Sequence, residues 1–137
     1  MRIDPEHRRG YVEIEGDVTN ATVIDVAHAL FQHEGWEPGF DAVWDGRKIT
    51  QLLLDENDVD EIVAQSQALS GVMRGGRAAV VVPREVDWIM ARLFLLRARH
   101  PDRERLTFHT LEEAMAWLDT PPEEGPSATE EGGRAGG

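Results

Sequence analysis

The residues best suited to chemistry are charged side chains that follow predicted strands. Asp45 and Arg47 come directly after the apolar run 42–44. Asp55 follows a second apolar run, and Arg84 follows a later strand. Ligands of open α/β sheets bind beyond the carboxyl ends of the strands, so these side chains could hold a metal ion or an anion. The same residue types are common in turns and at helix starts, and we favour that interpretation, which predicts no catalytic residue, no cofactor and no metal.

The other residues with reactive side chains form no recognisable catalytic pattern. His28 and His33 are five residues apart, whereas two metal ligands on one helix face are usually four apart. None of the serines lies in a G-x-S-x-G sequence, which disfavours a hydrolase. The chain has no cysteine, which excludes disulfides, thiolate metal sites and a cysteine nucleophile. We therefore expect a protein that is not an enzyme.

The composition predicts one acidic, soluble domain. A net charge of -12 disfavours nucleic acids and anionic membrane surfaces, because binding to either depends on Lys and Arg. The chain has no run near the ~18 apolar residues of a membrane span and no secretory start, so we expect a cytoplasmic protein. Residues 1–119 have the composition of a folded domain, whereas residues 120–137 form an acidic tail rich in Pro and Gly that we expect to be disordered.

Hydrophobic periodicity and turn residues predict alternating strands and helices around the stretch Asp41 to Glu61. This stretch combines a buried strand, a polar turn at 45–47, a second apolar run and a helix start capped by Asp55. The expected elements in chain order are strand 10–16, helix 20–34, strand 42–44, helix 55–70, strand 78–82, helix 86–99, strand 106–108 and helix 111–118. Because parallel strands joined by helices take right-handed crossovers, this order predicts an α/β fold with about four mostly parallel strands packed by about four helices. The β-branched strand 78–82 is expected inside the sheet.

The predicted helix 86–99 has more large apolar residues than one face against a sheet can bury. Its expected inward stripe comprises Val86, Ile89, Met90, Leu93 and Phe94. Trp88, Leu95 and Leu96 fall partly off this stripe, with Arg92 between them. An apolar patch with an arginine rim is typical of an interface, so we predict a homodimer formed through this helix. Core packing, or the lining of an apolar cleft, is the alternative for the three apolar side chains.

Several short motifs together resemble a known family. They are an Asp-x-Arg-x-Ile-Thr turn at 45–50, a Leu-Asp-x-x-Asp helix start at 54–58, an Arg-Ala-x-Val-Val strand at 77–81 and a Leu-Glu-Glu-Ala-x-x-Trp-Leu helix at 111–118. In this order and spacing, the chain resembles small bacterial proteins with a STAS-like fold, related to anti-sigma-factor antagonists, over about residues 3 to 118. The resemblance implies a single-domain STAS-like α/β fold and a regulatory role, although fold alone does not determine function.

The chain departs from the antagonists in the regulated loop. In those proteins, a serine or threonine after an Asp is phosphorylated to release a partner. Here Asp55 is followed by Glu56, Asn57 and Asp58, none of which has a hydroxyl. Thr50 is the one hydroxyl between residues 45 and 58, so we expect no phosphorylation of this segment apart from that position.

We therefore predict a non-enzymatic STAS-like regulatory or protein-interaction module that lacks the usual phosphorylatable serine. The expected partner surface comprises Asp45, Arg47, Thr50, Asp55, Glu56, Asp58, Trp88, Arg92, Leu95 and Leu96. The expected partner is another protein or a second copy of the chain, with no role for nucleic acid or membrane. The alternative is a domain that binds a small apolar or lipid-like ligand, as the similarity of this fold to lipid-carrying domains implies.

Overall fold

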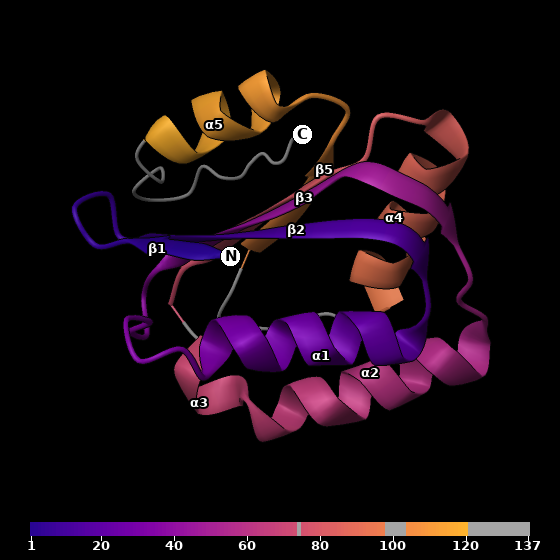
Figure 1. Ribbon diagram of the computed structural model, residues 1–137, viewed down its shortest axis with the longest axis horizontal. Helices are drawn as coiled ribbons and strands as arrows, with labels where there is room; N and C mark the ends of the chain where they lie inside the picture. The colour runs from indigo at the N-terminus through magenta and orange to yellow at the C-terminus, as the bar shows by residue number, and fades with distance from the viewer. Residues whose placement is uncertain (74, 98–103, 121–137) are drawn as a thin grey trace.

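Strands and helices alternate along the chain in the computed structural model, which describes residues 1–73, 75–97 and 104–120 (Figure 1). The elements are β1 (Arg2–Asp4), β2 (Arg9–Val18), α1 (Asn20–Phe31), β3 (Asp41–Leu52), α2 (Glu56–Ala68), α3 (Ser70–Met73), β4 (Arg77–Val81), α4 (Glu85–Arg97), β5 (Glu104–Phe108) and α5 (Leu111–Asp119). Each predicted helix and strand has a counterpart among the described residues, but β3 is much longer than the predicted strand 42–44, and the last two residues of the predicted helix 86–99 lie outside the described residues.

One sheet holds the five described strands in the order β1-β2-β3-β4-β5. β1 pairs antiparallel with β2, and all other neighbours are parallel. Right-handed crossovers between successive parallel strands place α1 and α2 on one face, and α5 covers the other (Figure 1). α4 runs past the end of the sheet, and its C-terminal half lines a cavity together with α1 and α2 (Figure 1). The predicted α/β class with mostly parallel strands is confirmed. The prediction of about four strands missed β1, because three residues are too few for a periodic pattern.

Each face of the sheet has its own apolar core. The core beneath α1 and α2 comprises Val12, Leu30, Phe31, Trp36, Phe40, Ala42, Leu69, Met73 and Ala78. The core beneath α5 comprises Val43, Ala79, Val81, Ala114 and Leu118. β3 and β4 therefore contribute to both cores, which explains why they read as continuous apolar runs instead of alternating ones.

β3 continues through the residues that were expected to form a turn. Residues 45–47 lie within this strand, so the predicted turn is wrong. The register between β2 and β3 shifts between Glu13 and Glu15, and a bulge in the pairing accommodates the polar residues without ending the strand. A Cβ atom on Gly46 would lie 2.7 Å from the backbone oxygen of Val81, so the glycine lets β3 stay paired with β4.

Three helices begin with capping boxes, including α2, whose cap at Asp55 the sequence predicts. Thr19, Asp55 and Thr110 each accept a hydrogen bond from the backbone N–H three residues later, and the side chain at that later position bonds back. In α2, the backbone N–H of Asp58 donates to Asp55 Oδ1 at 2.9 Å, and the N–H of Asp55 donates to Asp58 Oδ2 at 3.0 Å. These carboxylates stabilise the start of the helix, so the capping interpretation of Asp55 is confirmed.

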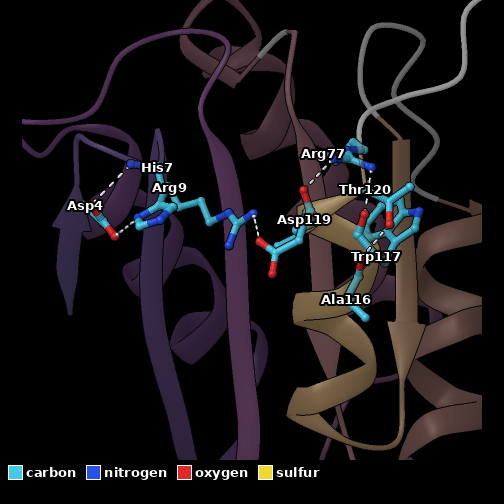
Figure 2. A network of polar contacts seen from close by, with 9 residues as sticks. Asp4, His7, Arg9, Arg77, Ala116, Trp117, Asp119 and Thr120 are labelled. Atoms are coloured by element: carbon cyan, nitrogen blue, oxygen red, sulfur yellow. Dashed lines mark hydrogen bonds and ion pairs between the residues drawn. The ribbon is translucent and has the colours of Figure 1, made fainter.

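Two arginines of the sheet hold the end of α5 (Figure 2). Arg9 Nη2 donates to Asp119 Oδ1 at 2.7 Å, and Arg77 donates to the carbonyl oxygens of Trp117 and Leu118 at 3.0 and 2.8 Å. Carbonyl groups in the last turn of a helix have no partner within the helix itself. The two arginines therefore satisfy the C-terminal end of α5 and fix it over β2 and β4.

Within the described ranges, no helix combines the length and apolar character needed to cross a membrane. The predicted tail, residues 120–137, lies outside the described residues except for Thr120. Thr120 is the C-cap of α5, and its hydroxyl donates to the carbonyl oxygen of Ala116 at 2.9 Å (Figure 2).

Candidate functional site

The face of α4 that is turned toward the protein differs from the predicted stripe. Four of the predicted inward residues are exposed: Val86 at 64%, Ile89 at 45%, Met90 at 38% and Leu93 at 58%. The buried residues of α4 are Asp87 and Ala91. The predicted stripe is therefore wrong, because the helix is rotated by about a third of a turn from the expected orientation.

Polar and aromatic contacts near the start of α4 explain this rotation. Asp87 is 5% exposed and accepts a hydrogen bond from Arg84 Nε at 2.6 Å. The Trp88 ring stacks on the His109 ring with centroids 4.8 Å apart and planes 12° from parallel. The guanidinium of Arg84 also donates to the carbonyl oxygen of Thr50, beyond the bulged part of β3. These contacts hold one side of the helix against the sheet, so Val86 and Ile89 of the predicted stripe are turned away from it.

A cavity of about 790 Å³ lies between α4, α1, α2 and the face of the sheet that α1 and α2 cover. Its apolar lining includes Val23, Ala27 and Phe31 of α1, Val59 and Ile62 of α2, Trp44, Ile49 and Val80 of the sheet, and Met90, Phe94 and Leu95 of α4. Leu93 and Leu96 also line the cavity and are 58% and 61% exposed, so it opens to solvent beside the C-terminal half of α4. Pockets that bind small molecules measure roughly 300–1,000 Å³.

The middle of the sheet shows where the cavity lies. Ala79 and Val81 of β4 are fully buried at 0% exposure, on the α5 face. Val80 stands between them and points to the opposite face, yet it is only partly buried. Its neighbour in β3, Trp44, is also only partly buried. Since strands inside a parallel sheet normally bury both faces, the accessible surface of these two side chains comes from the cavity.

A few polar side chains interrupt the apolar lining. They include His28 of α1, Ser66 of α2 and Arg105 of β5. Burial lowers the pKa of the Arg105 guanidinium, which nevertheless stays charged at neutral pH. Predominantly apolar walls with a few polar groups are typical of small-molecule sites.

The α4 end of the cavity is tied to α2 by ion pairs. Arg97 Nη2 lies 2.9 Å from Asp60 Oδ1, and Arg97 Nη1 lies 3.7 Å from Glu56 Oε2. All three side chains are 47% exposed or more, and exposed pairs of this kind contribute little stability. The connection between α4 and α2 is therefore weak compared with a packed helix interface.

Asp45 and Arg47, two of the predicted site residues, pair with each other. Arg47 Nε and Nη2 donate to the two carboxylate oxygens of Asp45 at 2.9 and 2.8 Å. These hydrogen bonds hold the pKa of the Asp45 carboxyl below its ordinary value. Arg47 lies beside Met115 of α5, away from the cavity. Thr50 is exposed near the end of β3.

The predicted residues at the start of α2 lie apart from that pair. Asp55 and Asp58 cap the helix, and the Glu56 side chain is 86% exposed. Asp55 and Glu56 belong to the rim of the cavity, whereas Arg47 lies beside α5. The structure therefore does not bring the region from Asp45 to Asp58 together as one surface.

The predicted residues of α4 divide between two environments. Leu95 and Leu96 line the cavity, whereas Trp88 does not. Trp88 packs on His109, and the Arg92 guanidinium lies 5.6 Å from the centre of the Trp88 ring. The Trp88 indole N–H is buried and has no hydrogen-bond partner within the part of the chain that the structure describes.

Sequence reasoning missed Arg105 as a cavity residue. The decisive signal is the register of the parallel strands, which the sequence alone does not display, because residues aligned across neighbouring strands point to the same face. Ala78 and Arg105 are aligned, and so are Val80 and Thr107. Arginine side chains in edge strands usually point to solvent, whereas Arg105 points toward the helices. Only the strand pairing reveals this orientation.

The turn between β1 and β2 contains a cluster of possible metal ligands. Side-chain atoms of Asp4, Glu6 and His7 lie within 4.8 Å of one another. His7 Nδ1 is already 2.8 Å from Asp4 Oδ2 (Figure 2). Glu6 and His7 are exposed, and an exposed acidic cluster alone does not identify a metal site, so we assign none here.

No family model, no curated protein and no solved structure matches this chain. The cavity and the sheet topology are therefore the basis for a functional proposal.

Proposed function

We propose that this protein is a non-enzymatic binding domain for a small apolar ligand, which occupies the cavity beneath α4. The observation that supports this function is the cavity itself, about 790 Å³ in volume and lined mainly by aliphatic and aromatic side chains. An apolar molecule in this space would cover the accessible surfaces of Val80 and Trp44. Each buried methylene group contributes roughly 0.8 kcal/mol, so a chain of several carbons gives useful affinity without any polar contact.

We further propose that the domain is a divergent STAS-like module of the cytoplasm. This proposal is supported by the short motifs of the sequence, and the mixed five-stranded sheet with its helices agrees with the general α/β class to which that fold belongs. The residues next to Asp55 have no hydroxyl that could be phosphorylated. In this proposal, ligand binding regulates the domain in place of phosphorylation.

The binding proposal is tested with an uncharged apolar fluorophore, N-phenyl-1-naphthylamine. Wild-type protein is expected to increase the fluorescence of this compound, and the signal should saturate at one fluorophore per chain. Val80→Phe, which fills part of the cavity, is expected to weaken binding about tenfold, as the loss of two buried methylene groups would. Leu106→Phe adds similar bulk on the opposite face of β5 and should leave the affinity unchanged.

Native mass spectrometry of the purified protein provides an independent measurement. A retained molecule that is lost in Val80→Phe but kept in Leu106→Phe supports the proposal. Wild-type protein that neither retains a ligand nor binds the fluorophore would show that the cavity has no binding function.

A second candidate function is self-association through α4, supported by the apolar residues that do not line the cavity. Val86 and Ile89 are 64% and 45% exposed, and a ligand in the cavity would not cover them. A second copy is the proposed occupant, because two copies of one helix face can bury such residues against each other in a two-fold dimer. Arg92 lies on the same exposed side, where it could pair with an acidic group of the other copy.

Sedimentation tests this second candidate directly. The expected result is a dimer at tens of micromolar for the wild type and a monomer for Ile89→Glu. Leu53→Glu introduces the same charge at a side chain that is 45% exposed elsewhere, so it should remain dimeric. A monomeric wild type at this concentration would refute the dimer, because a micromolar Kd corresponds to only ~8 kcal/mol of association.

A further inference from the structure

One of the four charged side chains that line the apolar cavity, among the described residues, is Arg105. Arg105 is the second residue of β5 and aligns with Ala78 at the start of β4. Both residues line the cavity. The Arg105 side chain is partly buried, and burial lowers its pKa.

Arg105 differs from the other described arginines because it has no partner among the residues that the structure describes. Arg9, Arg47, Arg77, Arg84 and Arg97 each donate to a carboxylate or a carbonyl oxygen, and Arg2, Arg8 and Arg92 each lie over an aromatic ring. Among the described residues, Arg105 has no hydrogen bond, ion pair or ring contact, and desolvation is the one influence on its pKa. A guanidinium has five N–H donors and cannot lose its charge in a protein.

An uncompensated cation in an apolar cavity is unfavourable unless an anion binds to it. Taking a charge out of water costs free energy that a hydrogen-bonded counter-ion offsets. A guanidinium also matches carboxylate and phosphate groups geometrically, because its N–H groups can donate two parallel hydrogen bonds. Arg105 therefore favours an anionic group on the molecule that fills the cavity.

The charges around the cavity are separated along its length. Arg105 lies where β4 and β5 begin, whereas Asp55 and Glu56 follow the opposite, carboxyl end of parallel strand β3. Glu56 is accompanied by Arg97, and Asp55 is bonded within its capping box. An elongated ligand with its anionic end at Arg105 would thus keep its charge away from the acidic end of the cavity.

We propose that the ligand is an anionic amphiphile, an aliphatic chain with a carboxylate or phosphate head group, and that Arg105 binds the head group while the chain lies beneath α4. This inference rests on the proposed ligand-binding function and specifies its ligand class. The polar end gives orientation and selectivity, and the apolar walls supply most of the affinity.

The experiment measures displacement of N-phenyl-1-naphthylamine by three matched molecules: dodecanoate, dodecyl phosphate and dodecan-1-ol. Wild-type protein is expected to bind at least one of the two anions about tenfold or more tightly than the alcohol, as a hydrogen-bonded charge pair requires. The better of the two anions identifies the head group.

Variants test whether Arg105 is the cause of this preference. Arg105→Gln is expected to bind the anions no better than the alcohol, with its affinity for the uncharged fluorophore unchanged, and Arg105→Lys should recover part of the preference. Arg47→Gln removes an arginine beside α5, outside the cavity, and should keep the full preference.

The outcomes separate this inference from the function on which it rests. Wild-type protein that binds the fluorophore but prefers the alcohol, or an Arg105→Gln variant that keeps the anion preference, would overturn the anionic ligand while leaving apolar binding intact. Failure of the wild type to bind the fluorophore would instead refute the binding function. The comparison of anions with alcohol in the wild type decides the ligand class even if a variant does not fold.

Discussion

Two adjacent valines of β4 test whether the space beside Val80 can accommodate a larger side chain. Val80 points into the cavity and is partly buried, whereas Val81 points to the α5 face and is 0% exposed. Val80→Phe and Val81→Phe make the same change in the same strand. Phe and Val are both favourable in strands, so differences in intrinsic propensity cancel between the two variants.

The expected effects have opposite signs. At position 80, four added carbons enter open space. Because the cavity is open on one side, only part of their surface is buried, so the gain is less than the full ~0.8 kcal/mol per carbon. The substitution should therefore stabilise the ligand-free protein by about 1 kcal/mol. At position 81, the ring must fit against Ala114 and Leu118, which are 0% and 4% exposed, so overpacking should destabilise by about 2 kcal/mol. The difference of about 3 kcal/mol corresponds to a difference in Tm of roughly 12 °C for a domain of this size.

The assay is urea and thermal unfolding of ligand-stripped protein, repeated at saturating ligand. Stripping is essential because a ligand bound to the folded state alone raises apparent stability, and Val80→Phe would lose this contribution. Equal destabilisation by both substitutions would refute the reasoning, since it would mean that packed side chains fill the space beside Val80.

Two further predictions concern the hydrogen bonds of two arginines on the α5 side of the sheet. Arg77→Met removes the donors to the last carbonyls of α5 and should destabilise the domain by about 2 kcal/mol, or about 8 °C in Tm, whereas Arg2→Met, at an exposed position over Tyr11, should change little. The pKa of Asp45 is lowered in the folded protein, so the pair with Arg47 stabilises fully above the unfolded-state pKa of about 3.9 and is lost as the pH falls through the folded value. Urea unfolding from pH 7 to pH 2.5 measures the difference in unfolding free energy between wild type and Asp45→Asn. This difference should be constant near neutral pH and shrink below about pH 4. A difference that grows toward low pH would contradict the expected sign.

The parts of the fold that the sequence predicted depend on local chemistry. The strand β2 alternates buried Val12 and Ile14 with exposed acidic residues, as its period of two requires. The helix starts at Thr19, Asp55 and Thr110 depend on hydrogen bonds within four residues. The uninterrupted β3 could not be predicted in the same way, because its bulge depends on pairing with two strands that are distant in sequence.

The candidate site was harder to predict because α4 is apolar on nearly every side. When all faces of a helix are apolar, periodicity does not determine which one turns inward, and a few specific contacts decide. Here these contacts are the buried Asp87 with Arg84 and the stacking of Trp88 on His109, the second of which joins residues 21 apart in the chain. The cavity and the inward position of Arg105 follow from this rotation and from the strand register, neither of which a single sequence displays.

The two uses proposed for α4 share part of its surface, which links them energetically. Val86 and Ile89 are available to a second copy alone, whereas Leu93 and Leu96 are exposed and also line the cavity. A ligand that covers Leu93 and Leu96 changes the surface that a second copy meets, and thermodynamic linkage requires dimerisation to change the ligand affinity in turn. We therefore expect saturating dodecanoate to change the dimer dissociation constant measured by sedimentation, and the ligand affinity per chain to differ between dimeric wild type and monomeric Ile89→Glu. Because each dimer binds two ligands, the change in the dimer dissociation constant should be the square of the factor in ligand affinity. No change in either quantity would show that the two events use separate surfaces of α4.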